Sequence, residues 1–331
     1  MPHNAPSPPA PRPGHVPLLS SLMRMTLRVV TAIPSRQDVR QVIRSRHERA
    51  IFRDVQVPVG GTMTAGLLML PAQAELVPVP AVFLAHGTSA PTPWAYLHYI
   101  RALLHRGVGV LFVELDGHAS HPRALTGAGL AQTAGDALRW LSMQPEVDPD
   151  RLATMGISLG GSCALNASAA TGLARAVALI STPVRVRMPS SARLSEFMTT
   201  LNPEALEGFR EAPPHLLLRT LRDSIRVASN AHEKGFYEID ILHGLTEPVI
   251  DDAIQFLNPL ESAASIGNTP AIFVNGNWDR IAPAEQALEL GRQFTGPTEH
   301  LLVPRRNHFT VMTNQKAAEE VGDWMLRWLS R

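Results

Sequence analysis

The chain has 331 residues, of which 45% are hydrophobic and 18% charged, a composition typical of globular proteins with one large domain or two modest ones. This excludes a disordered chain, a collagen and a small disulfide-stapled protein. The 30 basic residues balance 29 acidic residues, so no strong positive field is available to bind nucleic acid or an anionic membrane. A single cysteine, Cys163, permits no internal disulfide and no thiolate metal cluster, and we expect a cytoplasmic protein.

The first 49 residues differ in pattern from the rest of the chain. Residues 1–17 are rich in proline and lack the charged and apolar regions of a secretory signal, so we interpret them as a disordered leader. Residues 18–49 read as a helical segment. Its apolar part is interrupted by Arg24 and Arg28 and is too short to cross a bilayer, which predicts no integral membrane segment. We expect an amphipathic helix packed on the domain, with a helix lying on a membrane surface as the alternative.

From residue 50 onward, short apolar runs are separated by turn residues. Residues 51–59 and 63–70, joined by Gly60 and Gly61, predict a β-hairpin. The run 79–85 is apolar throughout, as in a parallel strand buried on both faces. Further predicted strands alternate with predicted helices: strands 108–113, 152–157, 176–180, 271–274 and 300–303; helices 94–105, 129–143, 160–170, 283–294 and 316–329. This order predicts an α/β fold with a mostly parallel central sheet, flanking helices and an antiparallel hairpin at one edge.

Residues 183–268 interrupt the alternation directly after the sixth predicted strand. They show helical periodicity, for example in 216–225 and 249–257, and no convincing strand. An insertion at the carboxyl end of a parallel strand lies over the edge where such sheets bind ligands. The sequence therefore predicts an α/β core at 50–182 and 269–331, with a helical cap at 183–268.

The most specific motif is Gly156-Ile157-Ser158-Leu159-Gly160, which fits G-x-S-x-G and lies between a predicted strand and a predicted helix. Such a turn forces the serine into a strained conformation that exposes its hydroxyl, and the flanking positions must be small. The alternative is a glycine-rich turn with an incidental serine. The strand before it and the helix after it favour the interpretation of Ser158 as a nucleophile.

A nucleophilic serine needs a base to take its proton and an acid to orient that base. In proteins with this elbow, the acid and then the histidine follow on loops after later strands. Asp279 follows the predicted strand 271–274, and His308 follows 300–303. Both lie at strand carboxyl ends, on the edge expected for Ser158, so we predict a Ser158–His308–Asp279 triad. Asp279 could alternatively cap the helix that begins near Pro283.

From about Phe52 to its C-terminus, the chain resembles the α/β-hydrolases. The stretch 136–161, with the elbow at its end, is similar to dienelactone-hydrolase-like esterases and prolyl-oligopeptidase-like peptidases. The resemblance implies an oxyanion hole formed by the backbone N–H groups of Leu159 and of Thr88, which follows His86-Gly87. His86-Gly87-Thr88-Ser89 departs from the H-G-G-G form of one lipase group. We expect His86, Gly87, Trp94 and Trp278 to line the substrate pocket, ordinary packing being the alternative for the two tryptophans.

The loop 116–121 contains His118 and His121 and resembles an Asp-, Gly- and Ser-containing loop of many α/β-hydrolases. Two histidines could bind a metal, but no third ligand with suitable spacing accompanies them and a serine hydrolase needs none. We therefore expect no metal and no cofactor, and place both histidines at the pocket rim or in hydrogen bonds of the loop.

These features predict a serine hydrolase that cleaves a small-molecule carboxylic ester through an acyl-enzyme. A serine peptidase or amidase and an acyltransferase would use the same triad, and a non-catalytic binding protein could retain the fold. About fifty residues before the first strand cannot supply the propeller of many related peptidases, which favours the esterase. We expect no nucleic-acid partner, and a homo-oligomer is compatible with the sequence.

Overall fold

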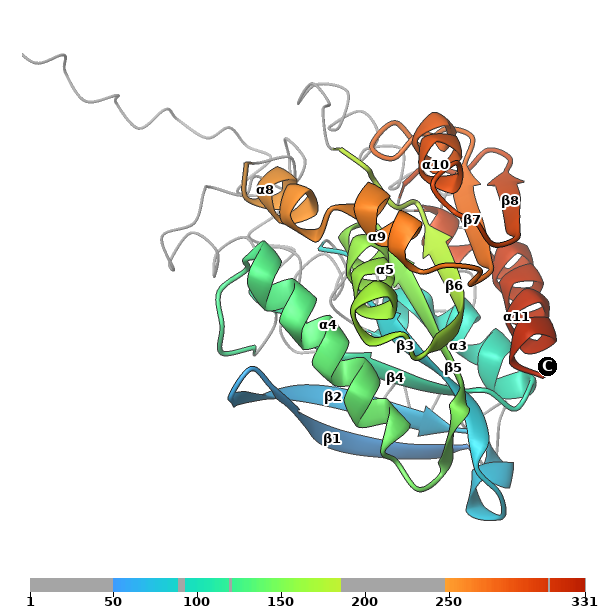
Figure 1. Ribbon diagram of the computed structural model, residues 1–331. Helices are drawn as coiled ribbons and strands as arrows, with labels where there is room; N and C mark the ends of the chain where they lie inside the picture. Colours follow the sequence, from blue (N-terminus) through green and yellow to red (C-terminus); the bar gives the residue numbers. More distant parts are fainter. Residues whose placement is uncertain (1–49, 89–92, 119–120, 186–247, 309, 331) are drawn as a thin grey trace, which may run out of the picture.

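The computed structural model describes residues 50–88, 93–118, 121–185, 248–308 and 310–330 (Figure 1). In this part of the chain, eight strands form one sheet in the order β1-β2-β4-β3-β5-β6-β7-β8. The strands are β1 (Ile51–Val59), β2 (Thr62–Leu70), β3 (Val79–Ala85), β4 (Gly109–Val113), β5 (Val147–Ile157), β6 (Ala174–Ile180), β7 (Ala271–Gly276) and β8 (Thr298–Val303). The α-helices are α3 (Leu97–His105), α4 (Gly127–Ser142), α5 (Leu159–Thr171), α8 (Pro248–Leu257), α9 (Pro259–Ser265), α10 (Ala284–Gly291) and α11 (Gln315–Leu329). Short 3₁₀ helices are η1 (Ala72–Glu75), η2 (Pro93–Tyr96) and η4 (Thr310–Thr313).

The sheet is parallel except at one edge. β1 pairs antiparallel with β2, and β2 pairs antiparallel with β4, whereas β4, β3, β5, β6, β7 and β8 all run parallel to one another. The edge hairpin and the mostly parallel sheet predicted from the sequence are therefore confirmed. Because the parallel strands point the same way, the loops that follow β3, β5, β7 and β8 meet at one edge.

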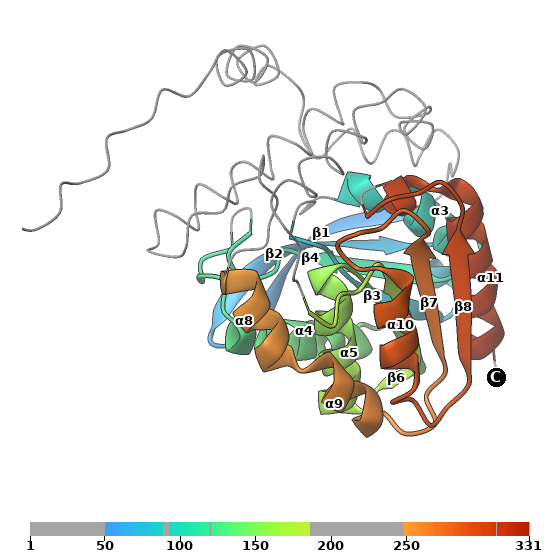
Figure 2. The same ribbon diagram turned by 90° about the horizontal axis from the view of Figure 1, so that it is seen from above.

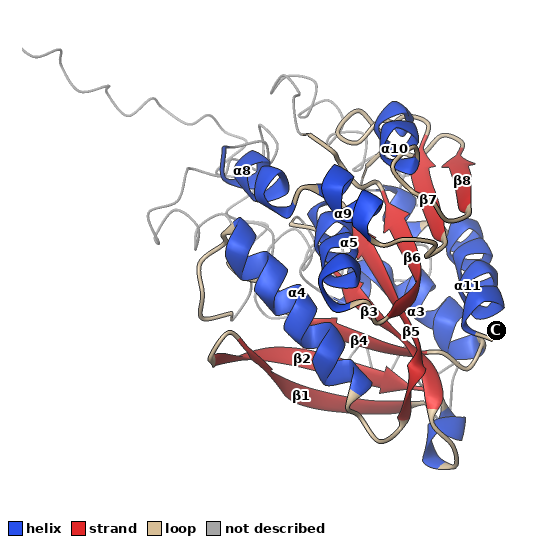
Figure 3. Ribbon diagram, in the orientation of Figure 1, coloured by secondary structure: helices blue, strands red, loops and turns tan. Residues whose placement is uncertain are grey.

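Helices cover both faces of the sheet (Figures 2 and 3). β3 shows why its sequence is apolar throughout: Val82 and Leu84 pack in the cluster formed with α3 and α11. Ala81, Phe83 and Ala85 point to the other face, in the cluster that includes residues of α4 and α5. Alternate side chains of a strand face opposite sides, so a strand between two helical layers must be apolar at every position.

Only the last part of the segment predicted as a cap, the helices α8 and α9, and the three residues 183–185 at its start belong to the described residues. Residues 186–247, like 1–49, lie outside the described residues. The helices α8 and α9 that follow them do not stand apart from the core: Ala253, Ile254 and Leu257 of α8 are almost fully buried in the same cluster as α4 and α5. Figure 2 shows α8 and α9 beside α4 and α5 on one face of the sheet. This part of 183–268 therefore belongs to the helical layer of the core.

Within the described ranges, we find no helix whose length and apolar character would allow it to span a membrane.

Candidate active site

The turn between β5 and α5 places Ser158 above the carboxyl edge of the sheet. Ser158 has φ 53° and ψ −127°, a backbone conformation that costs a non-glycine residue on the order of 1–3 kcal/mol. Two hydrogen bonds maintain it: the Ser158 N–H donates to the Ile180 carbonyl (2.9 Å), and the Ser158 carbonyl accepts from the Gly161 N–H (2.9 Å). The strain expected of a nucleophile elbow is thus present at this serine.

The glycines of the motif are required by close backbone contacts. A Cβ atom on Gly156 would lie 2.0 Å from the Gly160 carbonyl oxygen, and one on Gly160 would lie 2.2 Å from the Ala85 carbonyl oxygen. Real Cβ atoms do not approach backbone so closely, so larger residues would push α5 away from β3 and β5. The small residues let the N-terminus of α5 lie directly against the strand ends.

A continuous chain of hydrogen bonds joins Ser158, His308 and Asp279. The distance from Ser158 Oγ to His308 Nε2 is 2.9 Å, and His308 Nδ1 lies 3.2 and 3.1 Å from the two carboxylate oxygens of Asp279. Asp279 and His308 are 5% and 4% exposed. An ionised carboxylate only accepts hydrogen bonds, so Nδ1 carries the ring proton and Nε2 is left to accept the serine hydroxyl proton.

The Asp279 carboxylate is fixed by its own loop. Its Oδ1 also accepts the backbone N–H groups of Ile281 (2.9 Å) and Ala282 (2.8 Å). The N-cap residue of α10 is Pro283, so Asp279 orders the loop before this helix rather than capping the helix. Asn275 supports the same loop, because its Nδ2 donates to the Ala282 carbonyl (2.9 Å).

The loop that carries His308 is closed by Asn307 and Thr310, which the sequence analysis did not single out. Thr310 Oγ1 accepts the Asn307 N–H (2.9 Å) and donates to Asn307 Oδ1 (3.0 Å), which also accepts the Thr310 N–H (3.0 Å). The Asn-x-x-Thr spacing around the histidine was the signal for this contact. These reciprocal bonds join Asn307 directly before His308 to Thr310 at the start of η4.

The two predicted oxyanion donors come from the residue after Ser158 and from the loop that follows β3. Leu159 is the first residue of α5, where N–H groups have no partner within the helix and the helix dipole favours negative charge. Thr88 is buried and follows Gly87, which approaches the nucleophile closely: a Cβ atom on Gly87 would lie 3.2 Å from Ser158 Cβ.

The residues predicted to line the pocket have different surroundings. Trp278 is 57% exposed and lies directly before Asp279, while the side chain of Trp94 lies outside the described part of the structure. His86 is fully buried, with Nε2 accepting the Leu115 N–H (3.0 Å) and Nδ1 lying 3.0 Å from the Gly87 carbonyl. Both of its ring nitrogens are engaged by backbone, so His86 supports the loop instead of facing a substrate.

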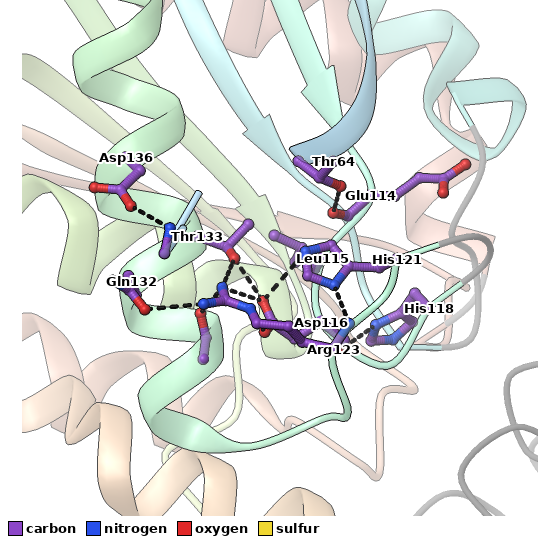
Figure 4. A network of polar contacts seen from close by, with 12 residues as sticks. Thr64, Glu114, Leu115, Asp116, His118, His121, Arg123, Gln132, Thr133 and Asp136 are labelled. Atoms are coloured by element: carbon purple, nitrogen blue, oxygen red, sulfur yellow. Dashed lines mark hydrogen bonds and ion pairs between the residues drawn. The ribbon is translucent and has the colours of Figure 1, made fainter. Parts of the chain in front are cut away.

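The loop after β4 is organised around the buried carboxylate of Asp116 (Figure 4). Arg123 Nε lies 2.8 Å from Asp116 Oδ1, and the Thr133 hydroxyl donates to Oδ2. His118 Nδ1 lies 2.8 Å from the Asp116 carbonyl, and His121 Nδ1 accepts the Arg123 N–H (3.1 Å). Burial lowers the pKa of His118 to about 4. These two histidines make hydrogen bonds within the loop, and the described residues contain no group of three or more His, Cys, Asp or Glu placed to hold a metal ion.

Comparison with known proteins identifies the family. Residues 82–323 match the model of the alpha/beta hydrolase family, and the chain belongs to this family.

The relatives found by sequence match only a short stretch of the chain, and the similar solved structures have low sequence identity to it. Two Mycobacterium tuberculosis strains each have an uncharacterised protein that is 41% identical over 64 residues, 19% of this chain and 23% of that protein. The chain thus matches about a quarter of the length of these curated relatives.

Among solved structures, a dienelactone hydrolase from Anabaena variabilis is similar with a TM-score of 0.53 and 15% identity, over 85% of this chain and 98% of that one. A Pyrobaculum calidifontis esterase has a TM-score of 0.58 and 14% identity, over 93% and 92%. A Pyrococcus furiosus esterase has a TM-score of 0.56 and 16% identity, over 90% and 95%. At these identities, the structural likeness establishes the fold.

Proposed function

We propose that the protein is a serine hydrolase that cleaves a carboxylic ester through an acyl-enzyme. The observation that carries this proposal is the hydrogen-bonded chain from Ser158 through His308 to Asp279, which brings together residues from three separate loops at one edge of the sheet. Dienelactone hydrolase and esterases among the similar structures support a hydrolase that acts on esters.

The mechanism follows from the hydrogen bonds. Ser158 Oγ attacks the ester carbonyl while His308 Nε2 accepts its proton, and the charged imidazole is stabilised by Asp279. The carbonyl oxygen becomes negatively charged in the tetrahedral state, where the N–H groups of Leu159 and Thr88 would donate to it. The C–O bond to the alcohol then breaks, and the alcohol leaves with the proton from His308. His308 next activates a water molecule, which releases the acid and restores Ser158.

The first test is hydrolysis of p-nitrophenyl esters from acetyl to palmitoyl, with aminoacyl p-nitroanilides alongside. We expect ester turnover, and we expect Ser158→Ala to lower kcat by about 10⁴-fold or more because the nucleophile is lost. Ser162→Ala is the matched control. Ser162 lies on the same helix, and its buried hydroxyl makes no hydrogen bond to the described residues, so this variant should keep kcat within about threefold of the unchanged protein.

Asp279→Asn tests the orienting role of the carboxylate. The asparagine can still accept the N–H groups of Ile281 and Ala282, but its own NH₂ group would face His308 Nδ1 and favour the wrong tautomer, so we expect a loss of about 10⁴-fold in kcat. Ester turnover that survives in Ser158→Ala would contradict the proposed function. Turnover of the anilides alone would favour a peptidase or amidase, and transfer to added alcohols in preference to water would favour an acyltransferase.

A further inference from the structure

The loop between β3 and η2 places a peptide group directly against the nucleophile. Gly87 lies so close to Ser158 that an added Cβ atom would be 3.2 Å from Ser158 Cβ and 3.1 Å from the Ile157 carbonyl oxygen. The orientation of the peptide groups on each side of Gly87 therefore decides which N–H can reach an oxygen bound to Ser158.

Tyr96 engages the first of these N–H groups. The Gly87 N–H donates to the Tyr96 hydroxyl at 2.9 Å, and the tyrosine side chain is fully buried and packs against Phe112. A buried N–H with a well-placed acceptor is held there, because losing the bond would leave it unsatisfied. Gly87 is thus unavailable as an oxyanion donor, and the next amide along the loop is that of Thr88.

His86 fixes the second peptide group. Its Nε2 accepts the Leu115 N–H, so the ring proton is on Nδ1 and is donated to the Gly87 carbonyl at 3.0 Å. Because a trans peptide is planar, the Gly87 carbonyl and the Thr88 N–H point in opposite directions. The His86 ring lies toward Leu115, which follows β4, whereas Ser158 follows β5, and β3 lies between these two strands. A carbonyl turned toward the β4 side therefore turns the Thr88 N–H toward Ser158.

We propose that Tyr96 and His86 are positioning residues that clamp the Gly87 peptide groups from both sides and aim the Thr88 N–H at the oxyanion. The effect of the clamp on catalysis rests on the proposed function, whereas the hydrogen bonds that form the clamp are a property of the loop. The clamp requires a neutral His86. A proton on Nε2 would remove the acceptor for the Leu115 N–H and set two donors against each other. The ring is packed between Phe112 and His118 (centroids at 5.3 and 4.7 Å). Burial and the neighbouring His118 lower the pKa of His86 well below its ordinary value.

Tyr96→Phe tests the clamp with the loss of one oxygen atom. We expect kcat for the best p-nitrophenyl ester to fall about 10- to 100-fold, with KM within threefold, because the oxyanion donor is misplaced while the pocket is unchanged. Tyr99→Phe is the matched control. Tyr99 is equally buried on the adjoining helix, and its hydroxyl donates to the Val311 carbonyl at 3.2 Å, away from the Gly87 loop; kcat should stay within threefold.

Two readouts separate positioning from general loss of structure. In the thiono ester of the same substrate, sulfur replaces the carbonyl oxygen. The oxyanion donors stabilise the tetrahedral state of this ester less than that of the oxygen ester. We therefore expect Tyr96→Phe to reduce the preference for the oxygen ester, while Tyr99→Phe leaves it intact. For His86, we expect His86→Gln, whose amide can both accept and donate, to retain more kcat than His86→Leu.

Hydrogen exchange measured by mass spectrometry tests the clamp without reference to activity. Peptides spanning residues 85–88 of the full-length protein should exchange faster in Tyr96→Phe than in the unchanged protein and in Tyr99→Phe. Unchanged exchange, or a fall in kcat that is equal for the oxygen and thiono esters, would overturn the clamp. A protein that hydrolyses no ester but shows the faster exchange would instead overturn the proposed function and keep the clamp as a structural feature.

Discussion

At the scale of single residues, a group of buried histidines lies beside the candidate oxyanion loop. His86 and His118 are in edge-to-face contact. His118, His121 and the Asp116 carboxylate belong to the loop that follows β4 (Figure 4). Burial lowers the pKa of all three histidines. The neighbouring histidines lower the pKa of His86 and His118 further, and Arg123 does the same for His121, although Asp116 raises the pKa of His118 and His121 in part. The rings are therefore neutral in the folded protein at pH 7 and would be costly to protonate.

This predicts that stability declines in mild acid. Between the ordinary histidine pKa of 6.5 and the pKa of about 4 for His118, the unfolded chain binds a proton that the folded chain does not. The free energy of unfolding therefore falls as the pH falls, by up to about 1.4 kcal/mol per pH unit for each such histidine. His118→Asn, which keeps an N–H near the position of Nδ1 but does not titrate, should flatten this slope in urea unfolding curves measured from pH 4.5 to 7.5.

The exposed His105 provides the control for this measurement. Its side chain is on the surface at the end of α3, so His105→Gln should change the slope much less than His118→Asn. A slope that is identical in His118→Asn and the unchanged protein would contradict the prediction, and would mean that His118 is protonated as readily when folded as when unfolded.

At the scale of elements, the junction of β5 and α5 depends on backbone packing that only glycine allows. Gly160 lies against the Ala85 and His86 carbonyl oxygens, at 2.2 and 2.5 Å from its hypothetical Cβ atom. Gly172, which ends the same helix with φ 66°, has no atom of the described part of the chain within 4 Å of such a Cβ atom. The first glycine is required by contact with another strand, and the second only by its backbone conformation.

We therefore expect Gly160→Ala and Gly172→Ala to differ in kind. Gly172→Ala should cost on the order of 1 kcal/mol of unfolding free energy, from the positive φ alone, and leave ester hydrolysis unchanged. Gly160→Ala must displace α5 and with it Ser158, so kcat should fall about 100-fold or more even in protein that is still folded. Urea unfolding and ester hydrolysis of both variants provide the measurement. Equal activity in the two variants would show that the helix can move without affecting Ser158.

The sequence pattern predicted most of these elements because their side chains repeat with the period of the backbone. It also indicated that Ser158, Asp279 and His308 would share one edge, since each follows a strand of a parallel sheet. The pattern missed the start of β5, because Asp148, Pro149 and Asp150 are uncommon in strands; there the chain is held by pairing of Val147 with Val79.

Two kinds of contact could not be predicted from the periodicity of the sequence. The bond from Gly87 to Tyr96 and the closed Asn307–Thr310 loop depend on the path of individual loops, not on periodicity. His86 was expected in the pocket because it belongs to the loop that carries the predicted oxyanion donor Thr88, but a side chain on a strand end can turn either toward the site or toward the neighbouring strand. Its ring turns toward β4, where the Leu115 N–H needs an acceptor.

At the scale of the whole molecule, the chain leaves the sheet after β6 and returns through α8 and α9 before β7. The returning helices join the face that already carries α4 and α5, and Leu257 and Ile254 are fully buried there. The Asn166 side chain on α5 also donates to the Leu257 carbonyl (3.4 Å). Because β7 carries the loop of Asp279, the packing of α8 helps to place one part of the candidate active site relative to the other.

This predicts that α8 contributes to the stability of the core and does not act as a separate cap. Ile254→Ala should lower the free energy of unfolding by about 2–5 kcal/mol, because it opens a cavity between α8 and the α4–α5 layer. Gln255→Ala, at the next position on the exposed side of the helix, should change it by less than about 0.5 kcal/mol. Both are measured by urea unfolding monitored by circular dichroism and by ester hydrolysis in parallel. If α8 were an independent cap, Ile254→Ala would change the acyl-chain preference and leave the urea midpoint of the core unfolding transition unchanged. A single unfolding transition shifted to lower urea concentration would instead place α8 in the cooperative unit that contains Ser158.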